Sequence, residues 1–147
     1  MKNKDFTMVA AIILLFLALA YSLPTSAAEV TADLVNAIAT VESGGDSKAI
    51  GDGGKALGMF QLHKVYVQDV NRILKRKAYT YEDRMNPKKS REMTIVYLKY
   101  YGWVYESKTG KPATLEVLAR IHNGGPNGWA KPATEKYWLK VKKALGQ

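Results

Sequence analysis

The chain has 147 residues, a formal net charge of +9 and no cysteine. One domain is expected at this length, and the lack of cysteine excludes disulfides, thiolate zinc sites and lipid attachment through a thiol. The two histidines lack metal-type spacing, so neither a metal nor a cofactor is predicted. A basic chain is attracted to anionic surfaces, which include bacterial walls and nucleic acid.

The N-terminal segment has the order of features typical of a secretory signal peptide. Lys2 and Lys4 precede an apolar run over residues 8–20, and small residues follow at 26–28. We therefore predict a signal peptide over residues 1–28 and a secreted or periplasmic domain over 29–147. The apolar run is shorter than the roughly 20 residues of a membrane span. An uncleaved N-terminal anchor is the alternative, and it would be the one contact with a membrane. Export argues against nucleic acid as a partner.

The mature part is predicted to be α+β and mainly helical. A first helix begins after Thr31, a suitable N-cap, and ends at Gly44-Gly45. One face of this helix carries Leu34, Ile38, Val41 and Glu42. Residues 50–54 are predicted to turn and residues 57–62 to form a strand, which gives a small β-hairpin beside the helix end.

Four more helices are expected. The second spans about residues 64–75, and the third starts at Asn86-Pro87 and ends at Gly102. Residues 107–112 are predicted to form a loop, followed by a helix of about nine residues that runs through Leu115, Leu118, Ala119 and His122. Residues 123–128 are too rich in glycine for regular structure. The last helix starts near Thr134.

Glu42 is the strongest candidate for chemistry. It lies on the apolar face of its helix, in the last turn, where burial and the helix dipole both raise the pKa of a carboxyl group. A carboxylic acid that stays protonated near neutral pH can protonate the leaving oxygen of a glycoside. The alternative is that Glu42 turns outward and is solvated.

Asp52 is the candidate second carboxylate. A hairpin that folds back over the helix end would place it across a cleft from Glu42, and glycosidases commonly use two carboxylates. The alternative is that Asp52 only shapes the turn, because Asp-Gly is a common turn dipeptide. Asp46 is a rival, which we interpret as a local capping or surface residue.

Several polar and aromatic residues are candidates for sugar binding. His122 and Asn123 end a helix at a glycine-rich loop, where they suit hydroxyl and N-acetyl recognition or simply cap the helix. Gln61 either binds sugar or ties the hairpin down. Candidates for stacking on sugar rings, most of which we expect in the core, are Tyr66, Trp103, Tyr105 and Trp129.

Ordered motifs over residues 34–142 resemble the lysozyme-like superfamily. Residues 41–45 (Val-Glu-Ser-Gly-Gly) and 58–62 (Gly-Met-Phe-Gln-Leu) look like the paired motif of lytic transglycosylases and goose-type lysozymes. Residues 119–128 (Ala-Arg-Ile-His-Asn-Gly-Gly-Pro-Asn-Gly), with Tyr137-Trp138 after them, resemble the C-terminal signature of invertebrate-type (destabilase) lysozymes. The resemblance implies a lysozyme-like fold with the small hairpin beside the catalytic helix end.

The resemblance also implies roles for individual residues. Glu42 matches the family's general acid and Asp52 its second carboxylate. The predicted substrate-binding residues are Ser43, Gln61, His63, Tyr66, His122, Asn123 and Tyr137. This chain departs from the family in three respects: it has no disulfides, the Asp52–Gly58 spacing is one residue shorter than in invertebrate-type lysozymes, and His122 stands where transglycosylases have tyrosine.

Three functions follow as hypotheses, with peptidoglycan glycan strands as the partner of an expected monomer. The first is hydrolysis of the β-1,4 bond between N-acetylmuramic acid and N-acetylglucosamine by Glu42 and Asp52. The second is lytic transglycosylation, in which Glu42 acts alone and the sugar's 6-hydroxyl closes an anhydro ring. The third is a wall-binding protein without activity, because a fold does not guarantee a function. Chitin stays open as a substrate.

Overall fold

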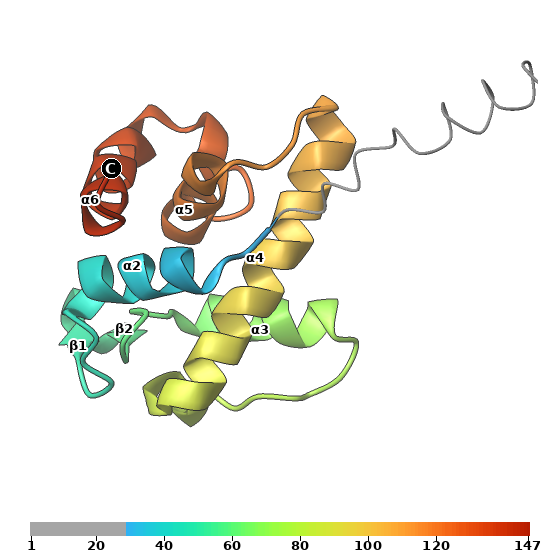
Figure 1. Cartoon of the computed structure of the whole chain (residues 1–147). Helices are drawn as coiled ribbons and strands as arrows, with labels where there is room; N and C mark the ends of the chain where they lie inside the picture. Colours follow the sequence, from blue (N-terminus) through green and yellow to red (C-terminus); the bar gives the residue numbers. More distant parts are fainter. Residues whose placement is uncertain (1–28) are drawn as a thin grey trace, which may run out of the picture.

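The computed structural model describes residues 29–147, so the predicted signal peptide lies outside the described residues. Five α-helices and one two-stranded sheet form this part of the chain (Figure 1). The helices are α2 (Ala32–Ser43), α3 (Lys64–Ile73), α4 (Pro87–Thr109), α5 (Leu115–Gly124) and α6 (Glu135–Ala144), and the strands are β1 (Ile50–Gly51) and β2 (Ala56–Leu57). Short 3₁₀ turns η1 to η4 lie at Asp52–Gly54, Glu82–Met85, Gly128–Ala130 and Pro132–Thr134. The predicted mainly helical, lysozyme-like α+β class is confirmed.

The first helix and the hairpin lie where the sequence predicts them. The hydroxyl oxygen of Thr31 accepts the N–H of Leu34, and Gly44 ends α2 in the left-handed conformation, with φ +67°. Antiparallel pairing of β1 with β2 then places the hairpin beside the end of α2 (Figure 1). The chain thus carries Glu42 and the η1 turn to neighbouring positions.

The predicted strand over residues 57–62 is wrong beyond Leu57. Gly58 has φ +76° and Gln61 has φ +48°, so the chain turns back and Leu62 forms an isolated bridge with Leu57. A Cβ atom on Gly58 would lie 2.0 Å from the carbonyl oxygen of Arg84, which explains why glycine is needed there. The apolar residues of this segment, including fully buried Phe60, therefore belong to a tight turn.

Two predicted boundaries near the C-terminal half are also wrong. Helix α4 passes through Gly102 and ends at Thr109, where Gly110 caps it with φ +68°. A glycine inside a helix costs about 1 kcal/mol relative to alanine, which does not outweigh the packing of Val104 and Tyr105 against the core. Helix α5 likewise continues to Gly124, two residues into the segment predicted to be irregular.

A single apolar core holds the helices together. Helix α2 packs against α6, α4 packs against α3 and α5, and α5 packs against α6. The largest fully buried side chains come from all of these elements and from the turn after β2, and they include Leu34, Ile38, Phe60, Leu62, Val67, Met93, Leu98, Leu118, Ile121 and Val141. In a chain without disulfides, this packing supplies the stability that fixes the cleft. No helix within residues 29–147 combines the length and the hydropathy that crossing a membrane requires.

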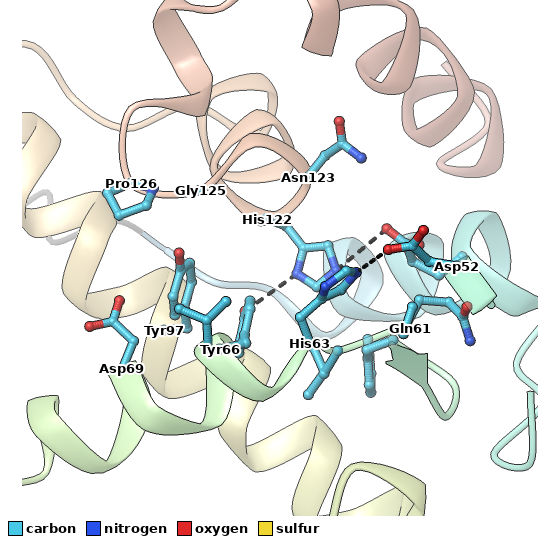
Figure 2. Close-up of a pocket in the computed structure, with 15 residues that line it drawn as sticks. Asp52, Gln61, His63, Tyr66, Asp69, Tyr97, His122, Asn123, Gly125 and Pro126 are labelled. Atoms are coloured by element: carbon cyan, nitrogen blue, oxygen red, sulfur yellow. Dashed lines mark hydrogen bonds and ion pairs between the residues drawn. The ribbon is translucent and has the colours of Figure 1, made fainter. Parts of the chain in front are cut away.

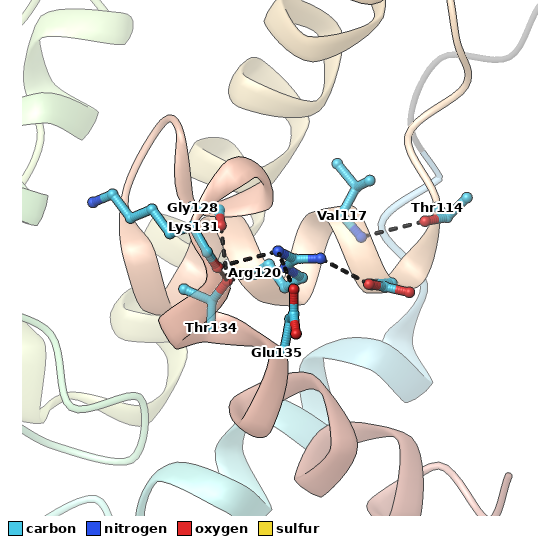
Figure 3. A network of polar contacts seen from close by, with 8 residues as sticks. Thr114, Val117, Arg120, Gly128, Lys131, Thr134 and Glu135 are labelled. Atoms are coloured by element: carbon cyan, nitrogen blue, oxygen red, sulfur yellow. Dashed lines mark hydrogen bonds and ion pairs between the residues drawn. The ribbon is translucent and has the colours of Figure 1, made fainter.

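Arg120 ties the C-terminal elements together (Figure 3). Its Nε donates to the hydroxyl of buried Thr134 at 3.0 Å, its Nη2 to the carbonyl of Lys131 at 3.1 Å and its Nη1 to the carboxylate of Glu116 at 2.9 Å. The Thr134 hydroxyl in turn donates to the carbonyl of Gly128 at 2.8 Å. One guanidinium therefore joins α5, η4 and the loop between them.

We expect Arg120→Met to destabilise the protein by about 2 kcal/mol, because the substitution removes three hydrogen bonds at once, including the one to the buried Thr134 hydroxyl. Chemical denaturation measures this change. The matched control is Arg76→Met, which alters an exposed arginine and should stay within about 0.5 kcal/mol of wild type. Equal effects of the two substitutions would contradict a special role for Arg120.

Candidate active site

A cleft of about 700 Å³ runs between the end of α2, the hairpin, α3 and the end of α5 (Figure 2). Both predicted carboxylates, Glu42 and Asp52, line it. The remaining lining residues are Ala56, Phe60, Gln61, Leu62, His63, Val65, Tyr66, Asp69, Tyr97, His122, Asn123, Gly125 and Pro126. Residues from α2, the hairpin, α3, α4 and α5 thus converge on one hollow, as expected of a ligand site.

Glu42 points into this cleft and is largely buried. Its side chain is 17% exposed, and its Oε1 lies 3.5 Å from Nε2 of His122. Burial raises the pKa of the Glu42 carboxyl, and the Tyr137 hydroxyl and the positive charge of Lys140 offset part of this rise. The outward-facing alternative is therefore wrong, and the protonated form needed for acid catalysis is favoured.

Tyr137 of α6 lies behind Glu42 and does not line the cleft. Its hydroxyl is sealed from solvent, and no atom within residues 29–147 meets strict hydrogen-bond geometry with it. It is close enough to Glu42 that each group affects the pKa of the other, and burial beside the carboxyl raises the pKa of Tyr137. Tyr137 thus supports the carboxyl from inside the protein.

His122 is buried between Glu42 and Tyr66. Its Nδ1 lies 3.3 Å from the Tyr66 hydroxyl, and the Tyr66 ring stacks on Tyr97 with centroids 3.9 Å apart. Burial lowers the pKa of His122 to about 4. The imidazole is therefore neutral at physiological pH, and it can hydrogen-bond to Glu42 without favouring the ionised carboxylate through its charge.

This buried histidine predicts a pH dependence of stability. Because its pKa falls from 6.5 in the unfolded chain to about 4 in the folded protein, the unfolded state takes up a proton first as the pH drops. Above pH 6.5 the histidine is neutral in both states, and the free energy of unfolding keeps its full value. It decreases by about 3 kcal/mol as the pH falls toward 4. We expect His122→Gln to flatten this dependence in denaturation curves measured from pH 7 to 4. The control His63→Gln, at the exposed histidine, should keep most of it.

Asp52 and His63 form a pair on the hairpin side of the cleft (Figure 2). The Oδ2 of Asp52 lies 3.5 Å from Nε2 of His63, and the side chains are 59% and 45% exposed. Asp52 has φ +48°, a left-handed conformation that aspartate tolerates better than most residues. The turn therefore holds a solvated carboxylate at the edge of the cleft that contains buried Glu42.

The other predicted residues divide into two groups. Tyr66 and Asn123 line the cleft, as does Gln61, whose amide nitrogen also donates to the carbonyls of Ala49 and Gly58 at 3.3 and 2.9 Å and so ties the hairpin down. Ser43 does not line it; its hydroxyl instead donates to the carbonyl of Met59 at 2.9 Å. Of the residues predicted to stack on sugar rings, Trp103, Tyr105 and Trp129 lie outside the cleft. Asp46 is also outside, and its carboxylate accepts the N–H of Lys48 at 2.8 Å.

The sequence interpretation missed Asp69 and Tyr97 as cleft residues. Asp69 forms an ion pair with Arg72 at 2.6 Å and accepts a hydrogen bond from the hydroxyl of Tyr101. The Asp69–Arg72 spacing, one helical turn, was a visible signal of an ion pair. The contact with α4 was not visible, because it joins residues 32 positions apart. Within residues 29–147, no group of three or more His, Asp or Glu side chains is arranged to hold a metal ion.

Comparisons with known proteins agree with this geometry. The family described as "Transglycosylase SLT domain" matches residues 23–144. The chain belongs to this family. Its predicted relationship to lysozyme-like proteins is thereby confirmed, and membership supports the predicted class of peptidoglycan-cleaving enzyme.

Individual relatives are lysozymes. The chain is 33% identical to a lysozyme of Ostrea edulis over 85 residues, which are 58% of this chain and 57% of that protein. It is 29% identical to invertebrate-type lysozyme 3 of Caenorhabditis elegans over 145 residues, which are 94% and 97% of the two chains. A shorter match, 54% identical over 37 residues, covers 25% of this chain and 27% of a lysozyme of Magallana gigas. The chain therefore spans about a quarter and just over half of the lengths of the Magallana and Ostrea relatives.

A solved structure has a similar fold. A chain in the crystal structure of Aeromonas hydrophila PliI in complex with Meretrix lusoria lysozyme superposes with a TM-score of 0.64 and 28% sequence identity. The match covers 78% of this chain and 89% of that chain. It extends over most of the part that carries the cleft.

Proposed function

We propose that this protein cleaves the β-1,4 bond between N-acetylmuramic acid and N-acetylglucosamine in peptidoglycan, outside the cytoplasm. The observation that carries the proposal is Glu42, a largely buried carboxyl group with a raised pKa at the centre of the cleft. Family membership and the lysozyme relatives agree with it.

In the proposed reaction, protonated Glu42 donates its proton to the glycosidic oxygen as the bond to the sugar breaks. Positive charge then develops on the sugar ring, in an oxocarbenium-like transition state. Asp52, at the edge of the same cleft, stabilises this charge, attacks the ring or positions water. Neutral His122 and the Tyr137 hydroxyl keep the Glu42 carboxyl in place.

Lytic transglycosylation is the second candidate, and the family match favours it specifically. In that reaction Glu42 acts first as acid and then as base, and the 6-hydroxyl of the muramic acid closes a 1,6-anhydro ring. No second carboxylate is required. The exposed position of Asp52 is compatible with both reactions.

Mass spectrometry of the soluble products from purified peptidoglycan tests the proposal. Hydrolysis gives reducing muropeptides, whereas transglycosylation gives products that are lighter by one water. The absence of any product from the folded protein would contradict both reactions on this substrate. In that case chitin would be tested next, and then binding to the wall without cleavage.

A further inference from the structure

A second hollow lies directly beside the cleft and is strongly basic. It has a volume of about 400 Å³ and is lined by Lys55, Lys64, Arg84, His63, Val65 and the Gly53-Gly54 turn. We refer to these residues as the basic groove. His63 and Val65 line both the groove and the cleft, so the two hollows share a wall.

The two lysines of the basic groove have no carboxylate partner within the described part of the chain. Both side chains are exposed. No aspartate or glutamate lines the groove. Two acids lie close to the groove: Asp52 faces the shared residue His63, and Glu82, two residues before Arg84, interacts with the charge of that arginine.

Arg84 adds a positive charge that is built into the floor of the groove. This arginine is only 4% exposed, and its guanidinium donates to the carbonyl oxygens of Tyr81, Lys55 and Leu62 at 2.7, 2.9 and 3.1 Å. These carbonyl groups accept hydrogen bonds from Nε and Nη1, but they do not neutralise the positive charge of the guanidinium. Within the described part of the chain, its Nη2 forms no hydrogen bond. The charge of Arg84 therefore adds to the charges of Lys55 and Lys64, and together they favour an anionic ligand in the groove.

The chemistry of peptidoglycan supplies such an anion at this position. The lactyl group of each N-acetylmuramic acid carries a short peptide with free carboxylates, and muramic acid is the sugar whose bond is cleaved. A strand seated in the cleft must therefore direct a peptide out of it close to the catalytic residues. Val65, 66% exposed on the shared wall, offers an apolar contact for the alanine methyl groups of that peptide.

We propose that the basic groove binds the carboxylates of the stem peptide, so that the protein selects peptide-bearing glycan strands over naked ones. This inference rests on the proposed function and names its substrate class more narrowly. Chitin, which has no peptide and no anionic group, should be a poor substrate for the same reason.

The test compares two substrates and two double variants. The substrates are glycan strands with their stem peptides and the same strands after an amidase has removed the peptides. The amidase leaves a lactyl carboxylate on each muramic acid, so the two substrates differ by the peptide and its own carboxylates. The variants are Lys55→Gln/Lys64→Gln in the groove and Lys99→Gln/Lys111→Gln, which removes the same charge from exposed lysines outside both hollows.

We expect wild type and the control variant to cleave peptide-bearing strands faster than naked ones, and the groove variant to lose about tenfold on peptide-bearing strands alone. High salt should reduce the difference. Equal cleavage of the two substrates by wild type, or an unchanged preference in the groove variant, would overturn the inference while leaving the proposed function intact.

If wild type cleaves neither substrate, the proposed function fails and binding decides the inference separately. Calorimetry would compare a disaccharide that carries a tetrapeptide with the peptide-free disaccharide. Tighter binding of the first by wild type, lost in the groove variant, supports the groove. Equal binding of both ligands would overturn it.

Discussion

Glu42→Gln should reduce the rate of glycan cleavage by about 10³-fold, because the amide cannot donate a proton to the leaving oxygen. Glutamine has nearly the same shape as glutamate and can keep the contact with His122, so the fold and substrate binding should persist. Release of soluble fragments from labelled peptidoglycan measures the rate. Activity within tenfold of wild type would contradict the role of Glu42 as general acid.

Stability gives an independent check on the same variant. Burial raises the pKa of Glu42 above its value in the unfolded chain, so ionisation costs more in the folded state. Below the pKa of the unfolded chain, the group is neutral in both states and does not change the free energy of unfolding. As the pH rises through the pKa of the folded protein, the decrease in this free energy becomes complete. Glu42→Gln should therefore melt at a higher temperature than wild type at pH 8 and at nearly the same temperature at pH 3. A variant that is inactive but more stable has lost the proton donor and kept the fold.

The place of Glu42 could be predicted because local signals determine it. Thr31 begins α2, Gly44 ends it in a conformation that favours glycine, and the 3.6-residue period puts Glu42 on the same face as Leu34 and Ile38. These signals act within a few residues of one another. The raised pKa follows from the position of the carboxyl on a buried face.

The surroundings of Glu42 could not be derived from local pattern. Tyr137 comes from α6 and His122 from α5, and only the packed core brings them to the end of α2. The motif resemblance identified both positions but not their geometry. In the same way, the apolar residues at 57–62 look like a strand locally, and the turn at Gly58 is explained by the backbone of Arg84, 26 positions later.

The basic groove shows the same limit. Lys55 and Lys64 are ordinary surface lysines in the sequence, and a Lys-rich chain has many of them. Their significance depends on Arg84, which reaches under the hairpin from η2 to the carbonyls of Lys55 and Leu62. Charge patterns alone cannot predict where a buried arginine meets exposed lysines.

Asp52→Asn should separate the two candidate reactions. If the protein is a hydrolase, we expect a loss of about 10²-fold or more, because the carboxylate that stabilises or attacks the sugar ring is gone. If it is a transglycosylase, the rate should stay within about threefold of wild type and the products should keep their anhydro ends. Asparagine is the best replacement, because it also tolerates the left-handed backbone that Asp52 adopts.

The control for this variant is Asp46→Asn, which removes a carboxylate that lies outside the cleft and can keep its contact with the N–H of Lys48. This control should retain wild-type activity under either reaction. His63→Gln refines the result, because it leaves the Asp52 carboxylate in place without its partner at 3.5 Å. A hydrolase that loses activity in Asp52→Asn but keeps most of it in His63→Gln uses the carboxylate itself. Comparable losses in both would instead indicate that the reaction depends on the pair.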